Sequence, residues 1–282
     1  MKVTFLILLT LVTTPAFSEF VFVAAPRGTR EEETKIYQPI ADYMSQITGT
    51  KIRYKYVRSW GEYRGMIRDD GSDFYFDGAQ FNSFRHEYKG GQFIARFPGP
   101  IKFEFIVKSD NNKITKISDT NGRPVCLHQE PNLATLQLFK HFIGGKTPMP
   151  VTIEGWDNAY RGVIKGDHNA RILEAGTCVA TVVPAGIRKK HDTTGATKVI
   201  YAFDPLPNNA LMANKYIQPD LVAKLREALT SGQCKACANL FTTYNVKEFV
   251  LVDEKDYLGV SNVLVNDFWL GKDIKAKVAV NQ

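Results

Sequence analysis

The sequence predicts an α/β protein of two lobes, each a mainly parallel sheet flanked by helices, with two crossing strands as a hinge. Strand and helix patterns alternate from residue 20 to residue 84, as in a parallel sheet with helices on both faces. A second alternating run covers residues 124–203. Extended apolar stretches near residues 101–108 and 203–212 join the runs. The chain therefore enters a second lobe and returns to the first.

The first run begins with an apolar strand over residues 20–25, which ends in the Pro-Arg-Gly loop at 26–28. The helix that follows carries three glutamates in its first turn, where the helix dipole favours them, and ends at Gly49. The elements expected next are a strand over 51–57, a helix over 59–67, a strand over 73–76 and a helix that begins at 77–79 and carries Phe81 and Phe84.

The second run follows the same pattern and contains a Gln-Glu-Pro-Asn loop at 129–132. Its expected strands are 124–127, 151–153, 177–183 and 198–203, and its expected helices are 133–142 and 156–164. A strand over 210–212 and a helix over 221–230 follow the return crossing. We expect the basic cluster Arg188-Lys189-Lys190 to be a solvated turn.

These elements place the lobe limits. Lobe I is expected to comprise residues 19–103 and 209–282, and lobe II residues 104–208. Such a fold binds ligands between its lobes, outside the carboxyl ends of the strands.

Residues 1–18 have the pattern of a cleaved signal peptide. Lys2 precedes an apolar run that ends at Val12, and the small-residue triplet Ala16-Phe17-Ser18 follows. The apolar run is shorter than the roughly 20 residues that cross a membrane. A buried N-terminal strand or helix is the alternative. We therefore expect an exported, soluble protein whose mature chain starts at Glu19.

The charge balance favours anionic ligands or surfaces. The chain has 36 lysines and arginines against 29 acidic residues, a formal net charge of +7. This excess is spread along the sequence, so it does not identify a ligand. No basic helix or base-stacking motif is present, and we expect no nucleic acid partner.

The four cysteines predict two disulfides, because an exported protein enters an oxidising space. Three connectivities are possible. Cys234 and Cys237 most simply pair with each other, which leaves Cys126 for Cys178. A redox role for this C-x-x-C motif is an alternative. Covalent haem attachment is not, because Ala238 stands where a histidine is required.

The loops that follow the strands contain the candidate ligand-binding residues. These are Arg27, Trp60, Asp77, Gly78, Ala79, Gln80, Asn132, Thr135 and Trp156. Arginine suits bidentate acidic groups, and a glycine before a helix lets a ligand approach free backbone amides.

Each candidate also has a structural alternative. A solvated charge would explain Arg27, half-buried packing would explain Trp60, and helix capping would explain Asp77 and the start of the lobe II helix. Trp156 shares a helix face with Tyr160, which favours core packing.

Catalytic patterns are weak. Cys126 and His128 could bind a metal or form a nucleophile–base pair, but we expect Cys126 to form a disulfide. The sequence has no paired histidines and no G-x-S-x-G motif. We expect no enzyme, no metal and no cofactor.

Several segments resemble, in order and spacing, the phosphate/phosphite/phosphonate-type periplasmic binding proteins, the solute receptors of ABC importers. The similar segments are Tyr37 to Met44, Asp73 to Ala79, Glu104 to Ser109, Ile114 to Val125, Trp156 to Asp167, and Pro205 to Pro207 with Ala210 to Met212. The resemblance covers most of the mature chain. It implies a two-lobed type II periplasmic binding protein fold, a periplasmic location and a role in phosphonate transport.

The resemblance also implies partners. A small ligand would be held between the lobes, and the protein, expected to be a monomer, would dock to an ABC permease or to the membrane sensor of a signalling system. The family's Ser/Thr-rich anion cradle corresponds to residues 129–135, where only Thr135 carries a hydroxyl and Glu130 would repel phosphate. The expected ligand is therefore a phosphonate-like oxyanion or a larger, more apolar molecule.

Overall fold

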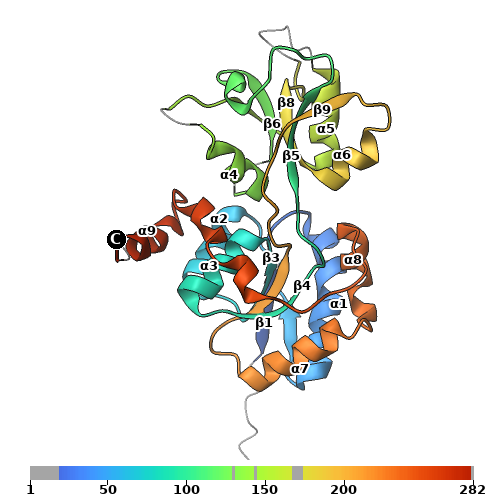
Figure 1. Ribbon diagram of the computed structural model, residues 1–282. Helices are drawn as coiled ribbons and strands as arrows, with labels where there is room; N and C mark the ends of the chain where they lie inside the picture. Colours follow the sequence, from blue (N-terminus) through green and yellow to red (C-terminus); the bar gives the residue numbers. More distant parts are fainter. Residues whose placement is uncertain (1–18, 129–130, 143–144, 167–173, 281–282) are drawn as a thin grey trace, which may run out of the picture.

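The computed structural model describes residues 19–128, 131–142, 145–166 and 174–280, and shows two lobes stacked end to end (Figure 1). The described residues form two five-stranded sheets, with strand orders β2-β1-β3-β10-β4 and β7-β6-β8-β5-β9. The predicted fold class is confirmed. The predicted signal peptide, residues 1–18, lies outside the described residues.

Lobe I begins with alternating strands and helices. In order these are β1 (Phe20–Ala24), α1 (Arg30–Thr48), β2 (Ile52–Tyr54), α2 (Trp60–Arg68), β3 (Phe74–Asp77), α3 (Ala79–Lys89) and β4 (Gln92–Arg96). Thr29 caps α1 with a capping box, and Gly49 ends that helix in the left-handed conformation. Strands β1, β2 and β3 are parallel. The sequence analysis did not predict β4.

Lobe II repeats this plan. Its elements are β5 (Phe103–Lys108), η1 (Ile117–Thr120), β6 (Pro124–Leu127), α4 (Leu133–Phe139), β7 (Met149–Thr152), α5 (Trp156–Lys165), β8 (Ala180–Pro184), α6 (Ala185–His191) and β9 (Thr197–Ala202). The predicted solvated turn at Arg188-Lys189-Lys190 is wrong, because these residues form the last turn of α6. There, positive charge is favoured by the helix dipole.

The chain then returns to lobe I. The elements are β10 (Ala210–Ala213), α7 (Pro219–Thr230), η2 (Lys235–Cys237), α8 (Ala238–Tyr244), η3 (Glu254–Tyr257), η4 (Val260–Leu264) and α9 (Gly271–Val280). Strand β10 lies antiparallel between β3 and β4, so the returning chain completes the first sheet. Helices α1, α7 and α8 pack on one face of this sheet, and α2, α3 and η4 pack on the other.

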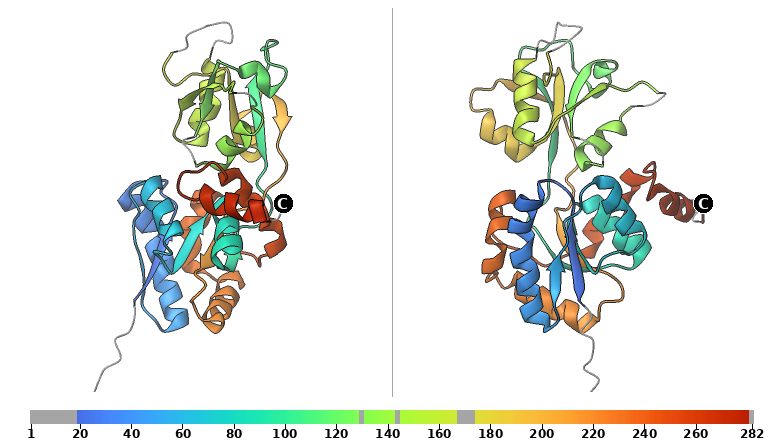
Figure 2. Two further views of the ribbon diagram at one scale, coloured as in Figure 1. Left: turned by 90° about the vertical axis from the view of Figure 1, so that its left-hand side faces the viewer. Right: turned by 180° about the vertical axis from the view of Figure 1, so that it is seen from behind.

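Two chain crossings connect the lobes, as predicted. They are joined where Ile101 and Leu206 form an antiparallel bridge, with N···O distances of 2.8 and 3.0 Å. The predicted lobe limits, after residue 103 and after residue 208, stay predictions. The C-terminal segment is a further link, because η4 contacts both α3 of lobe I and α4 of lobe II (Figure 2).

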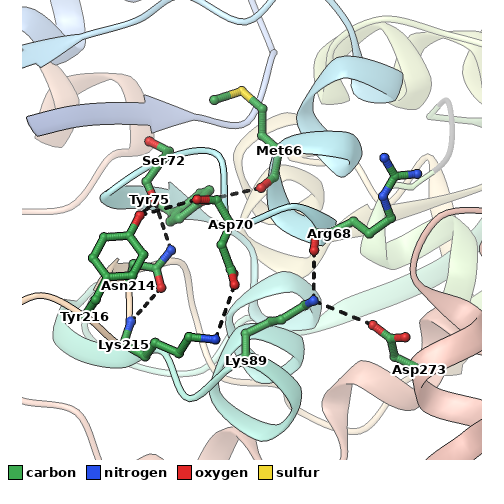
Figure 3. Close-up of polar contacts among 10 residues, drawn as sticks. All are labelled: Met66, Arg68, Asp70, Ser72, Tyr75, Lys89, Asn214, Lys215, Tyr216 and Asp273. Carbon is green, nitrogen blue, oxygen red and sulfur yellow. Dashed lines mark hydrogen bonds and ion pairs between the residues drawn. The ribbon is translucent and has the colours of Figure 1, made fainter.

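A polar network secures the end of lobe I away from the carboxyl ends of β1, β2 and β3 (Figure 3). The Asn214 amide donates to the carbonyl of Ser72 at 3.1 Å, and Lys215 pairs with Asp70 at 3.4 Å. The Lys89 ammonium donates to the carbonyl of Arg68 at 2.8 Å. These contacts join the α2–β3 loop to α3 and to the segment after β10.

The structure pairs Cys126 with Cys178 and Cys234 with Cys237, the connectivity that the sequence favours. The first disulfide joins β6 to the segment before β8 and is fully buried. It packs against α5 at Gly162, where an added Cβ would lie 2.8 Å from the Cys126 sulfur and 2.9 Å from the Gly176 carbonyl oxygen.

Gly162→Ala should therefore destabilise the protein by about 1–3 kcal/mol, because the new methyl group overpacks the disulfide. Gly65→Ala is the matched control, since an added Cβ in α2 meets nothing within 4 Å and alanine favours a helix. Denaturant unfolding followed by circular dichroism measures both. Equal midpoints for the two variants would contradict this packing.

Candidate functional site

The carboxyl ends of the parallel strands in the two sheets face the boundary between the lobes. The loop after β1 carries Arg27, and the loop after β3 leads into α3, whose second residue is Gln80. In lobe II, His128 follows β6, and Trp156 starts α5 after β7. Residues from both lobes therefore meet at one boundary.

A hydrogen bond crosses this boundary. The Gln80 amide donates to the carbonyl of Pro131 in lobe II at 2.9 Å, and only 3% of Gln80 is exposed. Its side-chain oxygen is buried and has no hydrogen-bond partner in the described part of the chain. Gly78 makes room for this oxygen, because an added Cβ would lie 2.6 Å from it. Ala79, between them, is buried.

His128 is the second side chain at the boundary that has a polar atom without a hydrogen-bond partner among the described residues. Its Nε2 is buried and has no partner among the described residues. Its ring lies 3.9 Å, centroid to centroid, from the Trp156 ring. Burial, and secondarily the positive charge of Arg27, lower the pKa of His128 to about 4. His128 is therefore neutral at pH 7 and can donate or accept one hydrogen bond at Nε2.

Arg27 brings a positive charge to the same place. Its guanidinium is exposed and donates to the Tyr244 hydroxyl at 2.5 Å. Buried Glu33 fixes the backbone of the Arg27 loop. Its Oε1 accepts hydrogen bonds from the backbone amides of Arg27 and Gly28 at 2.6 and 2.9 Å. The Tyr54 hydroxyl donates to the other oxygen of Glu33 at 2.7 Å. Burial raises the pKa of Glu33.

The Asp77 carboxylate is bonded to other side chains of lobe I. Its side chain is fully buried, pairs with Arg85 at 2.7 Å, and accepts a short hydrogen bond from Tyr63. Burial raises the pKa of Asp77, and the Arg85 charge opposes this effect. The capping alternative is also wrong, because Gly78 occupies the N-cap of α3. We therefore do not retain Asp77 as a ligand contact.

The side chains of Asn132, Thr135 and Trp60 make contacts within their own lobes. Asn132 caps α4 by accepting the Ala134 amide at 3.0 Å. The buried Thr135 hydroxyl donates to the His128 carbonyl at 2.8 Å, which fixes the loop that carries the imidazole. Trp60 stacks on Phe81, with ring centroids 6.1 Å apart. Gln129, Glu130, Asp167 and His168 lie outside the described residues.

Our sequence analysis considered His128 only as a partner of Cys126 and did not place it at the ligand site. Its position directly after strand β6 was the available signal, because the same rule selected Arg27 and Gln80. The Cys126 nucleophile is contradicted, since its sulfur is buried in a disulfide. Within the described ranges, no three His, Cys, Asp or Glu side chains gather as a possible metal site. None of the helices in those ranges is long and apolar enough to cross a membrane.

The stacked sheets, the paired crossings and the facing strand ends define a two-lobed periplasmic binding protein. The sequence matches the family described as the periplasmic substrate-binding protein of phosphonate ABC transporters over residues 22–257. The chain belongs to this family, whose members bind small molecules and work with ABC transporter membrane components. The recognition made from the sequence is confirmed.

Solved structures share the fold at low sequence identity. PhnD1 from Prochlorococcus marinus, in complex with methylphosphonate, has a TM-score of 0.63 and 14% identity, and the match covers 88% of this chain and 97% of that one. A Xanthomonas citri protein bound to ATP has a TM-score of 0.68 and 12% identity, covering 88% and 98%. The binding protein of a Pseudomonas aeruginosa ABC phosphonate transporter has a TM-score of 0.54 and 12% identity, covering 94% and 99%. No curated protein matches the sequence.

The low pKa of His128 predicts a pH dependence of stability. The folded protein binds this proton less readily than the unfolded chain, where the pKa is near 6.5. The contribution of neutral His128 is therefore complete above pH 6.5 and is lost as the pH falls towards 4, by up to about 3 kcal/mol. Urea unfolding between pH 7 and pH 4.5 measures this loss, and His128→Gln should lose less stability than the wild type. Parallel pH curves for the two proteins would contradict the buried position of the ring.

Proposed function

We propose that this protein captures a small phosphonate-like oxyanion between its lobes and delivers it to an ABC importer. Family membership supports the transport role. The observation that supports the site is that two buried polar atoms, on Gln80 and His128, have no hydrogen-bond partner among the described residues and lie at the same boundary as the exposed residue Arg27.

Each of these groups suits part of a phosphonate. Arg27 presents a forked donor that matches two oxygens of one anion. The Phe81 and Asn82 amides donate to the Gly78 carbonyl, but the helix supplies no acceptor for the Ala79 and Gln80 amides, and the helix dipole favours negative charge at this end. Gln80 offers an acceptor and His128 a donor, so a singly protonated oxyanion could satisfy both. Trp156, whose ring lies beside that of His128, would contact the organic part of the ligand.

Lobe closure couples binding to transport. A ligand that contacts both lobes stabilises the closed state, because only that state supplies both sets of contacts. The hinge would lie at the bridge between Ile101 and Leu206, with the lobe limits after residues 103 and 208 as part of the same proposal. The Gln80–Pro131 hydrogen bond would belong to the closed state.

The remaining features follow from this role. Residues 1–18 would direct export to the periplasm and be removed, and the mature protein would act as a monomer. Its membrane partner would be the permease, with a sensor domain as the alternative. An enzymatic role has less support, since the family consists of transport proteins and all four cysteines are paired.

Arg27→Gln should weaken methylphosphonate binding roughly 10- to 100-fold, because hydrogen bonds to a charged group contribute about 1.5–3 kcal/mol. Isothermal titration calorimetry measures the affinity. Arg68→Gln is the matched control, since Arg68 pairs with exposed Asp69 at the other end of lobe I and should leave affinity unchanged. Equal affinity of the wild type and the Arg27 variant would refute this site. Tighter binding of an uncharged aromatic compound by both would favour the apolar ligand instead.

A further inference from the structure

A basic cavity lies in lobe I at the edge strand β2, beside the loop that carries Arg27. Its volume is about 390 Å³, within the range of roughly 300–1,000 Å³ that is usual for ligand pockets. Its basic lining residues are Arg30, Arg53, Lys55 and Arg58. The only acidic lining residue is Glu62.

Most of the basic side chains at this cavity have no ion-pair partner in the described part of the chain. Arg53 pairs with Glu19 at 3.1 Å. In the described part of the chain, no carboxylate lies within 4.0 Å of the charged groups of Arg30, Lys55 or Arg58. The Glu62 carboxylate accepts the backbone amide of Arg58 at 3.0 Å. Like charges brought together in this way repel one another, and a bound anion would relieve that repulsion.

The cavity wall is built from ordered side chains. The guanidinium carbon of Arg30 lies 5.0 Å from the centre of the Tyr56 ring, a cation–π contact that holds Arg30 at the cavity. The buried Tyr54 forms another part of the wall. Two tyrosine rings therefore form the floor of the cavity, while Arg30, Arg53 and Arg58 at its rim are exposed.

The same wall is bonded to the Arg27 loop. The Tyr56 hydroxyl donates to the carbonyl of Gly28 at 3.3 Å. The Tyr54 hydroxyl donates to Glu33, which in turn accepts the backbone amide of Arg27. A ligand with one anionic group at Arg27 therefore has a second cationic site next to it in the same lobe.

We propose that this cavity is an anion subsite that binds the distal charged group of an extended polyanion, such as a polyphosphate or a phosphonate with a second acidic group. This inference rests on the proposed function, because Arg27 would hold the proximal group. It assigns to the protein a ligand with at least two anionic groups.

Tripolyphosphate and methylphosphonate are suitable probes, because only the first carries more than one anionic group. The variant Lys55→Gln/Arg58→Gln should bind tripolyphosphate about 10-fold or more weakly, while its affinity for methylphosphonate changes less than twofold. Calorimetry at low ionic strength measures both affinities, since salt screens exposed charges. Thermal unfolding checks that the variant is folded.

The matched control is Lys51→Gln/Lys215→Gln, which removes the same number of charges. Lys51 lies before β2 and pairs with Glu19, whereas Lys215 lies in the network of Figure 3 at the other end of lobe I. The control should change tripolyphosphate affinity less than threefold. Equal losses in the two double variants would reveal a diffuse field effect and overturn the subsite.

Arg27→Gln separates this inference from the proposed function. If Arg27 is not a ligand contact, that variant keeps its methylphosphonate affinity, whereas the cavity variant still loses tripolyphosphate affinity. If the cavity is not a subsite, the cavity variant binds tripolyphosphate as the wild type does, whatever Arg27 contributes. The second result overturns the inference.

Discussion

The double crossing of the chain between the two sheets is the constraint on which the rest of the structure depends. The chain leaves lobe I after β4, builds the second sheet, and returns as β10 between β3 and β4. The two crossings are hydrogen-bonded to each other at Ile101 and Leu206, so the lobes stay aligned about one short segment. Because the parallel strands of each sheet end towards the boundary, the loops that follow them meet there, and a ligand can contact both lobes at once.

The buried acidic side chains of lobe I have two different roles. Asp77 and Arg85 neutralise each other in the interior, where an unpaired charge would be very costly. Glu33 is buried as well, but it uses its oxygens to hold the backbone of the Arg27 loop. Arg27 is an exposed residue, and its guanidinium donates to the Tyr244 hydroxyl. Buried acids thus set the position of an exposed base, and lobe I presents a positive edge to lobe II.

The sequence rules failed where tertiary contacts decided the outcome. The pattern that placed Asp77 at the end of a strand was right about the strand, but the side chain turns inward because buried Arg85 and Tyr63 are available to it. The basic cluster at residues 188–190 has the composition of a solvated turn, but it forms the last turn of helix α6, where Arg188 pairs with Glu104 and Lys190 with Asp157. His128 was not among the predicted ligand-binding residues, because the sequence pattern suggested only a pair with Cys126. The Cys126 sulfur is bonded to Cys178, so it cannot form that pair.

The sequence by itself determined the fold class, the order of most strands and helices, and the family, because hydrophobic periodicity and segment resemblance are local properties of the chain. It also limited the ligand site to the loops after the strands. Only the tertiary structure decided which of those loop residues face the boundary. That choice depends on partners distant in sequence, such as Pro131 for Gln80 and Tyr244 for Arg27, and no local pattern encodes such pairs.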